Sequence, residues 1–462
     1  MSLLVVGGEV GGRAGVDVRV EGGVVTEVGA GLRPGRGDDV VEAGGGAVLP
    51  GLHDHHVHLR ALAAARASVA VGPPGVRDRA AFADRLRRAV AAAPPGGWVR
   101  ATGYHESVAG PLDRHALDAV VGDAPVRVQH RTGTLWVLSS AAVRLAGVDA
   151  CPLPGVERDG AGRPTGRLWR MDGWLRAAVP AVPADLAAVG REAAARGVTG
   201  LTDADPERAP GAVEALAALP QRVHVMGPLG LAVPDGTRLT VGPVKVILHD
   251  EELPAPADLA ATVAAAHAEG RPIAVHCVTR VQLVVAALAL DEAGARPGDR
   301  IEHASVAPDD LLPHLRRLGV TVVTQPNLVA ERGDEYRREV DPDDVPHLYR
   351  CRSLVMAGIP TAGSTDAPFG GADPWAAVAA AVDRRTASGA VLGEAERLDP
   401  AAALALFLGP AEAPAEPRRV EPGAPGDLCV LAAPLAEVLA DPAAARVAAT
   451  AVAGEVVHRR DR

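Results

Sequence analysis

Residues 50–58 read PGLHDHHVH and stand at the exit of a short apolar run over 47–51 that predicts a β-strand. Side chains alternate along an extended chain, so histidines two positions apart point to the same side. His56 and His58 can therefore bind one metal ion. A histidine-rich surface tract would also trap metal, though more weakly. Because a predicted strand directly precedes the histidine cluster, we favour a metal site within the fold over a surface tract.

Outward from this stretch, apolar strands alternate with Ala/Leu-rich helices. Helices are predicted over 256–269, 282–293 and 308–318. Repeated strand–helix units indicate a parallel sheet with helical crossovers. Seven further strands are predicted, at 198–203, 222–227, 244–249, 272–276, 300–303, 320–325 and 359–364.

With the strand at 47–51, these units number eight and predict a (β/α)₈ TIM barrel. Catalytic residues of such barrels lie at the C-terminal ends of the strands. The segment over 66–183 is too long for one strand-to-helix connection. We interpret it as an inserted subdomain with strands of its own, such as 126–130.

Three more candidate ligands stand where predicted strands end. His276 ends one strand, His303 ends the next, and Asp366 follows the last. Singly, each is as easily explained as a satisfied polar residue or a helix cap. Together with His56 and His58 they face one barrel mouth, and imidazole and carboxylate ligands in this mixture suit zinc and its neighbours.

The chain resembles the amidohydrolase superfamily, and within it amidohydrolase family 3, a group of metal-dependent hydrolases. The stretches that carry the resemblance run nearly from end to end: PGLHDHHVHL, GVTGLTDAD, VKVILHD, RPIAVHCVT, DRIEHAS, TVVTQPN, AGIPTAGSTDAPFG and PGAPGDLCVL. The resemblance implies a (β/α)₈ barrel over 51–409 and a small β-sandwich composed of 1–50 and 410–462. Short Val-rich strands are predicted at both chain ends.

The resemblance also implies a set of metal-site residues. They are His56, His58, Lys245, His276, His303 and Asp366. In the binuclear members, a lysine at the end of the fourth strand is carboxylated and bridges the metals, and Lys245 holds that place. It is the only lysine among 47 basic residues, and an unpaired ammonium in its apolar strand would be costly to bury. Pairing with Asp203 or Asp250 is the alternative. The expected cofactor is a divalent metal, zinc, as two ions.

The expected reaction is hydrolysis of an amide-type, non-peptide C–N bond of a small molecule. Zinc lowers the pKa of bound water from about 15.7 toward about 7, and Asp366 can transfer the proton to the leaving nitrogen. His130 and Asn327 are the candidate substrate-binding residues, and His53 and His55 are further candidate donors to the oxyanion.

Two other functions stay open. A mononuclear deaminase of the same superfamily would have no lysine bridge and a Glu three residues after His276, where this chain has Thr279. A non-catalytic scaffold would have lost part of the ligand set. The complete set argues against the scaffold.

The composition of the chain restricts the class of protein and its expected cellular location. The net charge of −10 disfavours nucleic-acid binding. No apolar run reaches the roughly 18 residues of a membrane helix, and we expect neither a membrane partner nor a signal peptide. Four scattered cysteines, without a paired motif, favour a reducing cytoplasm. A homo-oligomer is possible, and no partner besides the small-molecule substrate is expected.

Overall fold

The computed structural model describes residues 2–181 and 184–460. The chain divides into two compact units, and each is described by itself. The first unit contains residues 1–59 and 186–462, and the second contains 60–185. The first boundary falls between residues 59 and 60, one residue into helix α1 (Leu59–Arg66).

The first unit is built around a sheet of eight parallel strands. In spatial order they are β6 (Leu52–Val57), β13 (Val198–Asp203), β14 (Arg222–Gly227), β15 (Leu239–Ile247), β16 (Ile273–Cys277), β17 (Arg300–His303), β18 (Thr321–Thr324) and β19 (Thr361–Gly363). This mixed α/β architecture, with an eight-stranded and nearly closed parallel barrel, confirms the predicted TIM-barrel fold class.

The chain after β19 fastens the two outer strands of this sheet to each other. The amide of Asp366 donates to the His56 carbonyl at 2.9 Å, and the amide of His58 donates to the Ala367 carbonyl at 2.8 Å. Gly363 at the end of β19 and His53 near the start of β6 donate to the consecutive carbonyls of residues 406 and 407. The two outer strands are therefore linked at two levels, which nearly closes the barrel.

The first barrel strand lies further along the chain than the sequence predicts. Residues 48–50 form β5 (Val48–Pro50), which pairs antiparallel with β20 (Leu428–Leu431) outside the barrel. The barrel strand is β6, which contains the histidine cluster itself. The predicted strand at 47–51 was wrong as a barrel strand, because an apolar run fits the buried edge of either sheet.

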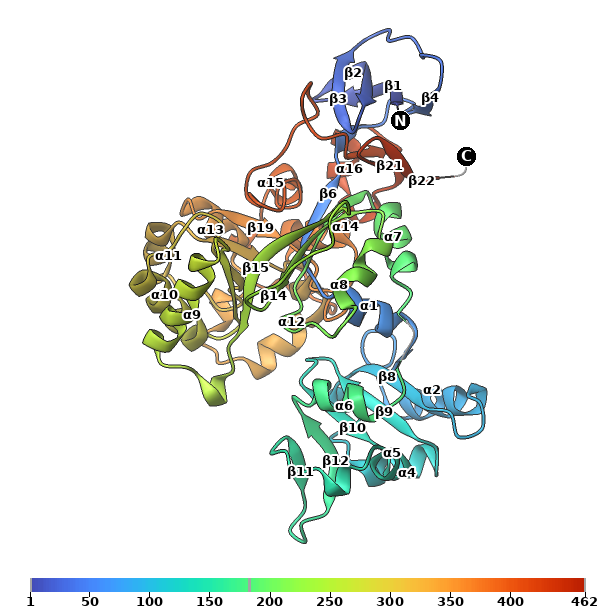
Figure 1. Ribbon diagram of the computed structural model, residues 1–462, viewed down its shortest axis with the longest axis vertical. Coiled ribbons are helices and arrows are strands. Elements are labelled where there is room, and N and C mark those ends of the chain that lie inside the picture. The colour runs from blue at the N-terminus through green and yellow to red at the C-terminus, as the bar shows by residue number, and fades with distance from the viewer. Residues whose placement is uncertain (1, 182–183, 461–462) are drawn as a thin grey trace. The chain divides into compact units, whose positions relative to one another are not determined.

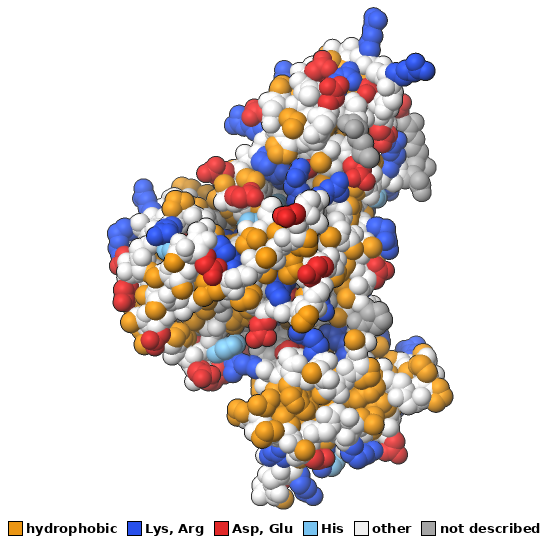
Figure 2. All heavy atoms as spheres, viewed as in Figure 1, with side chains coloured by type: hydrophobic (Ala, Val, Ile, Leu, Met, Phe, Trp, Pro, Cys, Tyr) orange, Lys and Arg blue, Asp and Glu red, His pale blue; other side chains and the backbone are white. Residues whose placement is uncertain are grey.

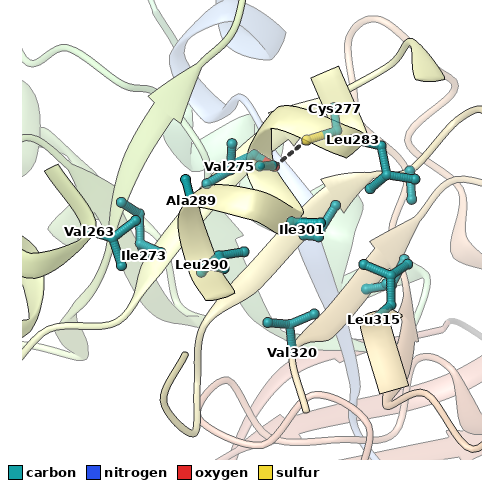
Figure 3. Close-up of a cluster of buried hydrophobic side chains, with 14 of the residues drawn as sticks. Val263, Ile273, Val275, Cys277, Leu283, Ala289, Leu290, Ile301, Leu315 and Val320 are labelled. Carbon is teal, nitrogen blue, oxygen red and sulfur yellow. Dashed lines mark hydrogen bonds between the residues drawn. The ribbon is translucent and has the colours of Figure 1, made fainter. Parts of the chain in front are cut away.

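Helices pack outside the barrel sheet, and a large hydrophobic core lies beneath three of them (Figure 1). They are α9 (Pro256–Ala268), α10 (Arg280–Ala293) and α11 (Leu312–Leu318). Their Ala, Val and Leu side chains interdigitate with those of β16 and β17, as Figure 3 shows for Val275, Leu290 and Ile301. Small aliphatic side chains fill this core in a chain with 2% aromatic residues.

The remaining helices of this unit connect or flank the strands. Their bounds are α7 (Leu186–Ala195), α8 (Ala212–Ala215), α12 (Asn327–Glu339), α13 (Cys351–Met356), α14 (Pro374–Asp383), α15 (Pro400–Ala405) and α16 (Leu435–Ala440). Helix α10 begins at a side-chain cap, since the Thr279 hydroxyl accepts the Gln282 amide at 3.3 Å.

Both chain ends contribute strands to two small sheets beside the barrel (Figure 1). One contains β1 (Ser2–Val10), β2 (Arg13–Glu21), β3 (Val24–Gly29) and β4 (Asp38–Glu42), and the other contains β5, β20, β21 (Val447–Val452) and β22 (Glu455–Arg459). One apolar cluster joins them, since Leu3 and Val18 pack in the same core as Leu428 and Ala449.

The second unit has a six-stranded sheet with a hydrophobic core on each face. The strands in spatial order are β11 (Val156–Arg158), β12 (Pro164–Trp169), β10 (Leu135–Leu138), β9 (Val126–His130), β8 (Val99–Tyr104) and β7 (Val69–Ala70). The helices are α2 (Arg79–Ala92), α3 (Glu106–Ala109), α4 (Arg114–Val121), α5 (Ser140–Ala146) and α6 (Asp172–Ala178).

One face of the molecule carries charges of both signs (Figure 2). On the face in Figure 2, acidic and basic side chains are interspersed over the barrel unit. Among the residues that the structure describes, no helix combines the length and apolar character that a membrane crossing requires.

Candidate metal centre

A β-bulge aims the histidines of β6. Residues 201 and 203 of β13 pair with residues 54 and 57 of β6, so β6 carries one extra residue over this interval. A bulge redirects the side chains that follow it. His55 and His56 are both fully or almost fully buried, although they are adjacent in sequence. The strand thus contributes more buried imidazoles to the barrel interior than simple alternation allows.

His56, His58 and Asp366 form the tightest part of the site. Asp366 Oδ1 lies 3.6 Å from His56 Nε2 and 3.4 Å from His58 Nε2. One possible ligand atom from each residue lies within 4.8 Å of those of the other two. Asp366 has a φ of 54° and His303 a φ of 70°. Left-handed backbone at residues other than glycine is strained and gathers at functional sites.

Lys245, His276 and His303 come from three neighbouring strands. In the parallel register, Lys245 lies beside residue 274 of β16, and His276 lies beside Glu302 of β17. The ring centroid of His303 is 4.5 Å from that of His276 and 4.7 Å from that of His56. The six residues that the sequence singled out as metal ligands thus project into one region of the barrel.

Three of the four candidate metal-binding histidines form a hydrogen bond through Nδ1. Each has a different side-chain partner, and the sequence analysis missed all three partners. His58 Nδ1 lies 2.7 Å from Asp205 Oδ1, and His303 Nδ1 lies 2.8 Å from Gln325 Oε1. His56 Nδ1 forms a short hydrogen bond with Glu302. An acceptor at Nδ1 fixes the proton there and leaves the Nε2 lone pair for a metal.

Glu302 is in turn held by Arg300, two residues earlier on β17. Arg300 Nε donates to Glu302 Oε1 at 2.7 Å, and Arg300 Nη2 donates to the His55 carbonyl at 2.6 Å. Both side chains are buried. One signal was available in the sequence: Arg300 and Glu302 stand two apart on a strand, so they share a face.

The pKa values of the site residues shift in different directions while no metal is bound. Burial and the nearby Lys245 lower the pKa of His56 to about 3. Burial also lowers the pKa of Lys245. For His58, burial is outweighed by the hydrogen bond to Asp205 and the neighbouring carboxylate of Asp366, which raise the pKa to about 10. Burial opposes ionisation of Asp366, but the neighbouring imidazoles of His58, His303 and His56 lower its pKa.

Asn327, a candidate substrate ligand, has a structural task. Its Nδ2 donates to the Thr365 carbonyl at 3.0 Å and to Glu331 Oε1 at 3.2 Å. Both partners are acceptors, which fixes the orientation of the amide. The side chain thereby fastens the segment before Asp366 to α12. Its buried Oδ1, without a partner among the described residues, can accept a hydrogen bond but cannot donate one.

The contacts of the other candidate donors are local to their own units. His130 belongs to the 60–185 unit, where Nε2 lies 2.9 Å from Glu106 Oε2. His53 bonds Thr202 at 2.9 Å and stacks on His55 at 4.4 Å between ring centroids. Both ring nitrogens of His55 are buried and lack a partner among the described residues.

The donor set suits a metal. In the described part of the chain, His56 Nε2, Asp366 Oδ1 and Lys245 Nζ are buried without hydrogen-bond partners. Burying an unpaired polar atom costs free energy. Here these atoms lie near imidazole rings whose Nδ1 atom is already hydrogen-bonded. Imidazole and carboxylate ligands of this kind fit zinc and similar divalent ions.

A family comparison agrees with this geometry. A sequence model described as "Amidohydrolase family" matches residues 39–458. The chain belongs to the amidohydrolase family. The chain is thus a hydrolase of carbon–nitrogen bonds other than peptide bonds.

Individual proteins match the chain over most of its length. An N-substituted formamide deformylase of Arthrobacter pascens is 26% identical and covers 88% of this amidohydrolase and 87% of its own length. The putative amidohydrolase YtcJ of Bacillus subtilis is 23% identical, with 79% of each chain covered. A structure of an uncharacterized metal-dependent hydrolase from Pyrococcus horikoshii has a TM-score of 0.70 at 21% identity, covering 92% of this chain and 96% of its own.

Proposed function

We propose that this amidohydrolase binds two divalent metal ions, with zinc as the natural ion, and hydrolyses an amide-type, non-peptide C–N bond of a small molecule. The ligands are His56, His58, Lys245, His276, His303 and Asp366. The observation that carries the proposal is the set of Nδ1 partners on His56, His58 and His303. Orienting three imidazoles in this way serves metal binding, and a non-catalytic scaffold without metals would not require it.

Lys245 supports two ions rather than one. Its side chain is buried and its Nζ lacks a partner among the described residues. Neither Asp203 nor Asp250 pairs with it: Asp203 bonds Arg208 and the amide of residue 59, and Asp250 Oδ1 accepts from Thr279 at 2.8 Å. A carboxylated Lys245 would be an anionic oxygen ligand, and the positive charge of the ions that it would hold would compensate the burial of its own charge.

The metals, when bound, supply Lewis-acid polarisation of the substrate carbonyl and a nucleophile derived from water at neutral pH. The protein's own contribution centres on Asp366. Its Oδ1 faces the imidazoles of His56 and His58, and its ionised carboxylate can take a proton and deliver it to the leaving nitrogen. General acid–base help of this kind is worth roughly 10²–10⁴-fold in rate.

The deaminase function lacks its required carboxylate. Thr279 occupies the position three residues after His276, caps α10 and bonds Asp250. We therefore favour amide-type substrates, and among them N-substituted formamides stand first because a relative over most of the chain is a deformylase of that class.

A substrate panel tests this function. The zinc-loaded protein is assayed on N-substituted formamides, N-acyl amines, carbamates, lactams and, as the opposing class, aminated heterocycles that would release ammonia. We expect turnover in the amide group and its loss in Asp366→Asn at unchanged fold. Ammonia release from heterocycles without amide hydrolysis would contradict the proposal.

A further inference from the structure

Asp54, the one acidic residue of the stretch 50–58, has no part in the proposed ligand set. It is buried, and it lies on β6 two residues before His56. Its Oδ1 accepts the amide of Thr365 at 3.0 Å and the amide of His56 at 3.3 Å, and its Oδ2 accepts the Thr365 hydroxyl in a short hydrogen bond. The carboxylate thus links β6 to the segment after β19, directly before Asp366.

Thr365 extends this link to the backbone around Asp366. Its hydroxyl donates to Asp54, and the same oxygen accepts the amide of Ala367 at 3.3 Å. Its carbonyl accepts Asn327 Nδ2 at 3.0 Å. Thr365 therefore contacts both of the peptide groups that flank the α-carbon of Asp366.

The left-handed backbone of Asp366 depends on such contacts. A φ of 54° is strained at a residue other than glycine, and it persists only where the surrounding structure fixes it. The peptide group before this residue is held at both ends, because its carbonyl accepts from Asn327 and its amide donates to the His56 carbonyl at 2.9 Å. The peptide group after it is held as well, because its carbonyl accepts the Phe369 amide at 2.8 Å and its amide donates to Thr365.

The place of the Asp366 carboxylate follows from this backbone. Its Oδ1 lies 3.6 Å from His56 Nε2 and 3.4 Å from His58 Nε2. A different φ at Asp366 would move the side chain relative to both imidazoles. A displacement of about 1 Å at a reacting group can cost about 10²-fold in rate. A residue that fixes this backbone can therefore affect the reaction without touching the substrate.

We propose that Asp54, acting through Thr365, is a positioning residue that sets the Asp366 carboxylate against His56 and His58. The effect on catalysis rests on the proposed function. The effect on the geometry of the site rests only on the hydrogen bonds between β6 and the segment after β19.

Thr365→Val tests the link, because valine has nearly the shape of threonine but no hydroxyl. Thr450→Val on β21 is the matched control, since Thr450 is equally buried and donates to the Ala194 carbonyl at 2.6 Å. Each change removes one buried hydroxyl, so both should lower the unfolding temperature. Only Thr365→Val should lower kcat, by about 10- to 100-fold, with KM changed by less than about threefold. Thr365→Ser, which keeps the hydroxyl, should restore most of kcat.

Two further readouts do not depend on turnover. In the Co²⁺-loaded protein, the visible d–d absorption should shift in Thr365→Val and stay unchanged in Thr450→Val. In the metal-free protein, deuterium exchange of the backbone amides over 364–370 should accelerate only in Thr365→Val.

The proposal is overturned if Thr365→Val matches Thr450→Val in all three readouts, or if it differs from that control in deuterium exchange alone. Failure of the unaltered chain to hydrolyse any amide-type compound would contradict the proposed function instead. In that case the Co²⁺ absorption and the deuterium exchange still decide whether Asp54 positions Asp366.

Discussion

The Nδ1 atom of His56 is hydrogen-bonded to Glu302, while its Nε2 atom lies 3.6 Å from Asp366 Oδ1. The His56 imidazole thus lies between two carboxylates. Glu302 orients the ring, and Asp366 is proposed to bind the same metal as His56. The two residues of the first contact are 246 positions apart in the sequence. Arg300 neutralises Glu302, so the orienting charge is itself held in place.

Replacing Glu302 with Gln should weaken metal binding. The change removes the charge that raises the basicity of His56, and partners of this kind are worth about 10–100-fold in metal affinity. It also leaves the buried Arg300 unpaired, at a cost of about 3–5 kcal/mol in the free energy of unfolding. Chelator competition measures the first effect and denaturant unfolding the second.

A double variant separates these two effects. Adding Arg300→Met to Glu302→Gln removes the unpaired cation, so folding stability should largely recover while metal affinity stays low. If affinity recovered together with stability, Glu302 would support the fold and not the metal ligand.

Replacing Asp205 should reveal whether charge or only hydrogen bonding matters at His58. Gln325 already holds His303 through a neutral amide oxygen. Asp205→Asn should therefore preserve ring orientation and reduce metal affinity by less than about tenfold, whereas Asp205→Ala should cost up to about 100-fold. Equal losses in the two variants, measured by chelator competition, would show that the carboxylate charge is essential.

Lys245→Arg should retain a cation yet lose the second metal. A guanidinium with a pKa above about 12 has no nucleophilic amine to capture carbon dioxide. Lys245→Ala should regain part of its activity with a short carboxylate such as propionate. Metal content by elemental analysis and rescue by propionate are the two readouts. Two ions and normal turnover in Lys245→Arg would falsify the bridge.

Asp366→Asn should keep much of the metal and lose catalysis. The amide can coordinate through oxygen but cannot accept a proton at neutral pH. We expect kcat to fall by about 10²–10⁴-fold, whereas His56→Ala should lose metal first. Wild-type kcat in Asp366→Asn would reduce the residue to a loop contact with His56.

Removing the metals should abolish hydrolysis reversibly. Chelation followed by desalting should eliminate turnover, and zinc, cobalt or manganese should restore it. Ligands that bind only the folded state stabilise it, so the metal-free barrel should unfold at a lower temperature. Full activity in a rigorously metal-free preparation would rule out metal-dependent catalysis.

The alternation of strands and helices could be predicted from the sequence, because apolar residues recur with a different spacing in strands and in helices. Val-rich runs and Ala/Leu-rich helices recur between residues 198 and 364, and the parallel barrel follows from that order. The prediction that residues 47–51 form the first barrel strand was wrong. β5 and β6 are both buried, and only their pairing partners distinguish a barrel strand from a strand of the small sheet.

The sequence by itself determined which side chains stand at strand ends, among them His56, His276, His303 and Asp366. Periodicity is a local property, and a strand of fixed polarity places its last residue at the barrel mouth. Only the tertiary structure decided which partners orient those side chains. Glu302, Asp205 and Gln325 reach histidines 22 to 246 positions away. Such contacts depend on the closure of the barrel and on a bulge in β6, and neither is encoded in a local pattern.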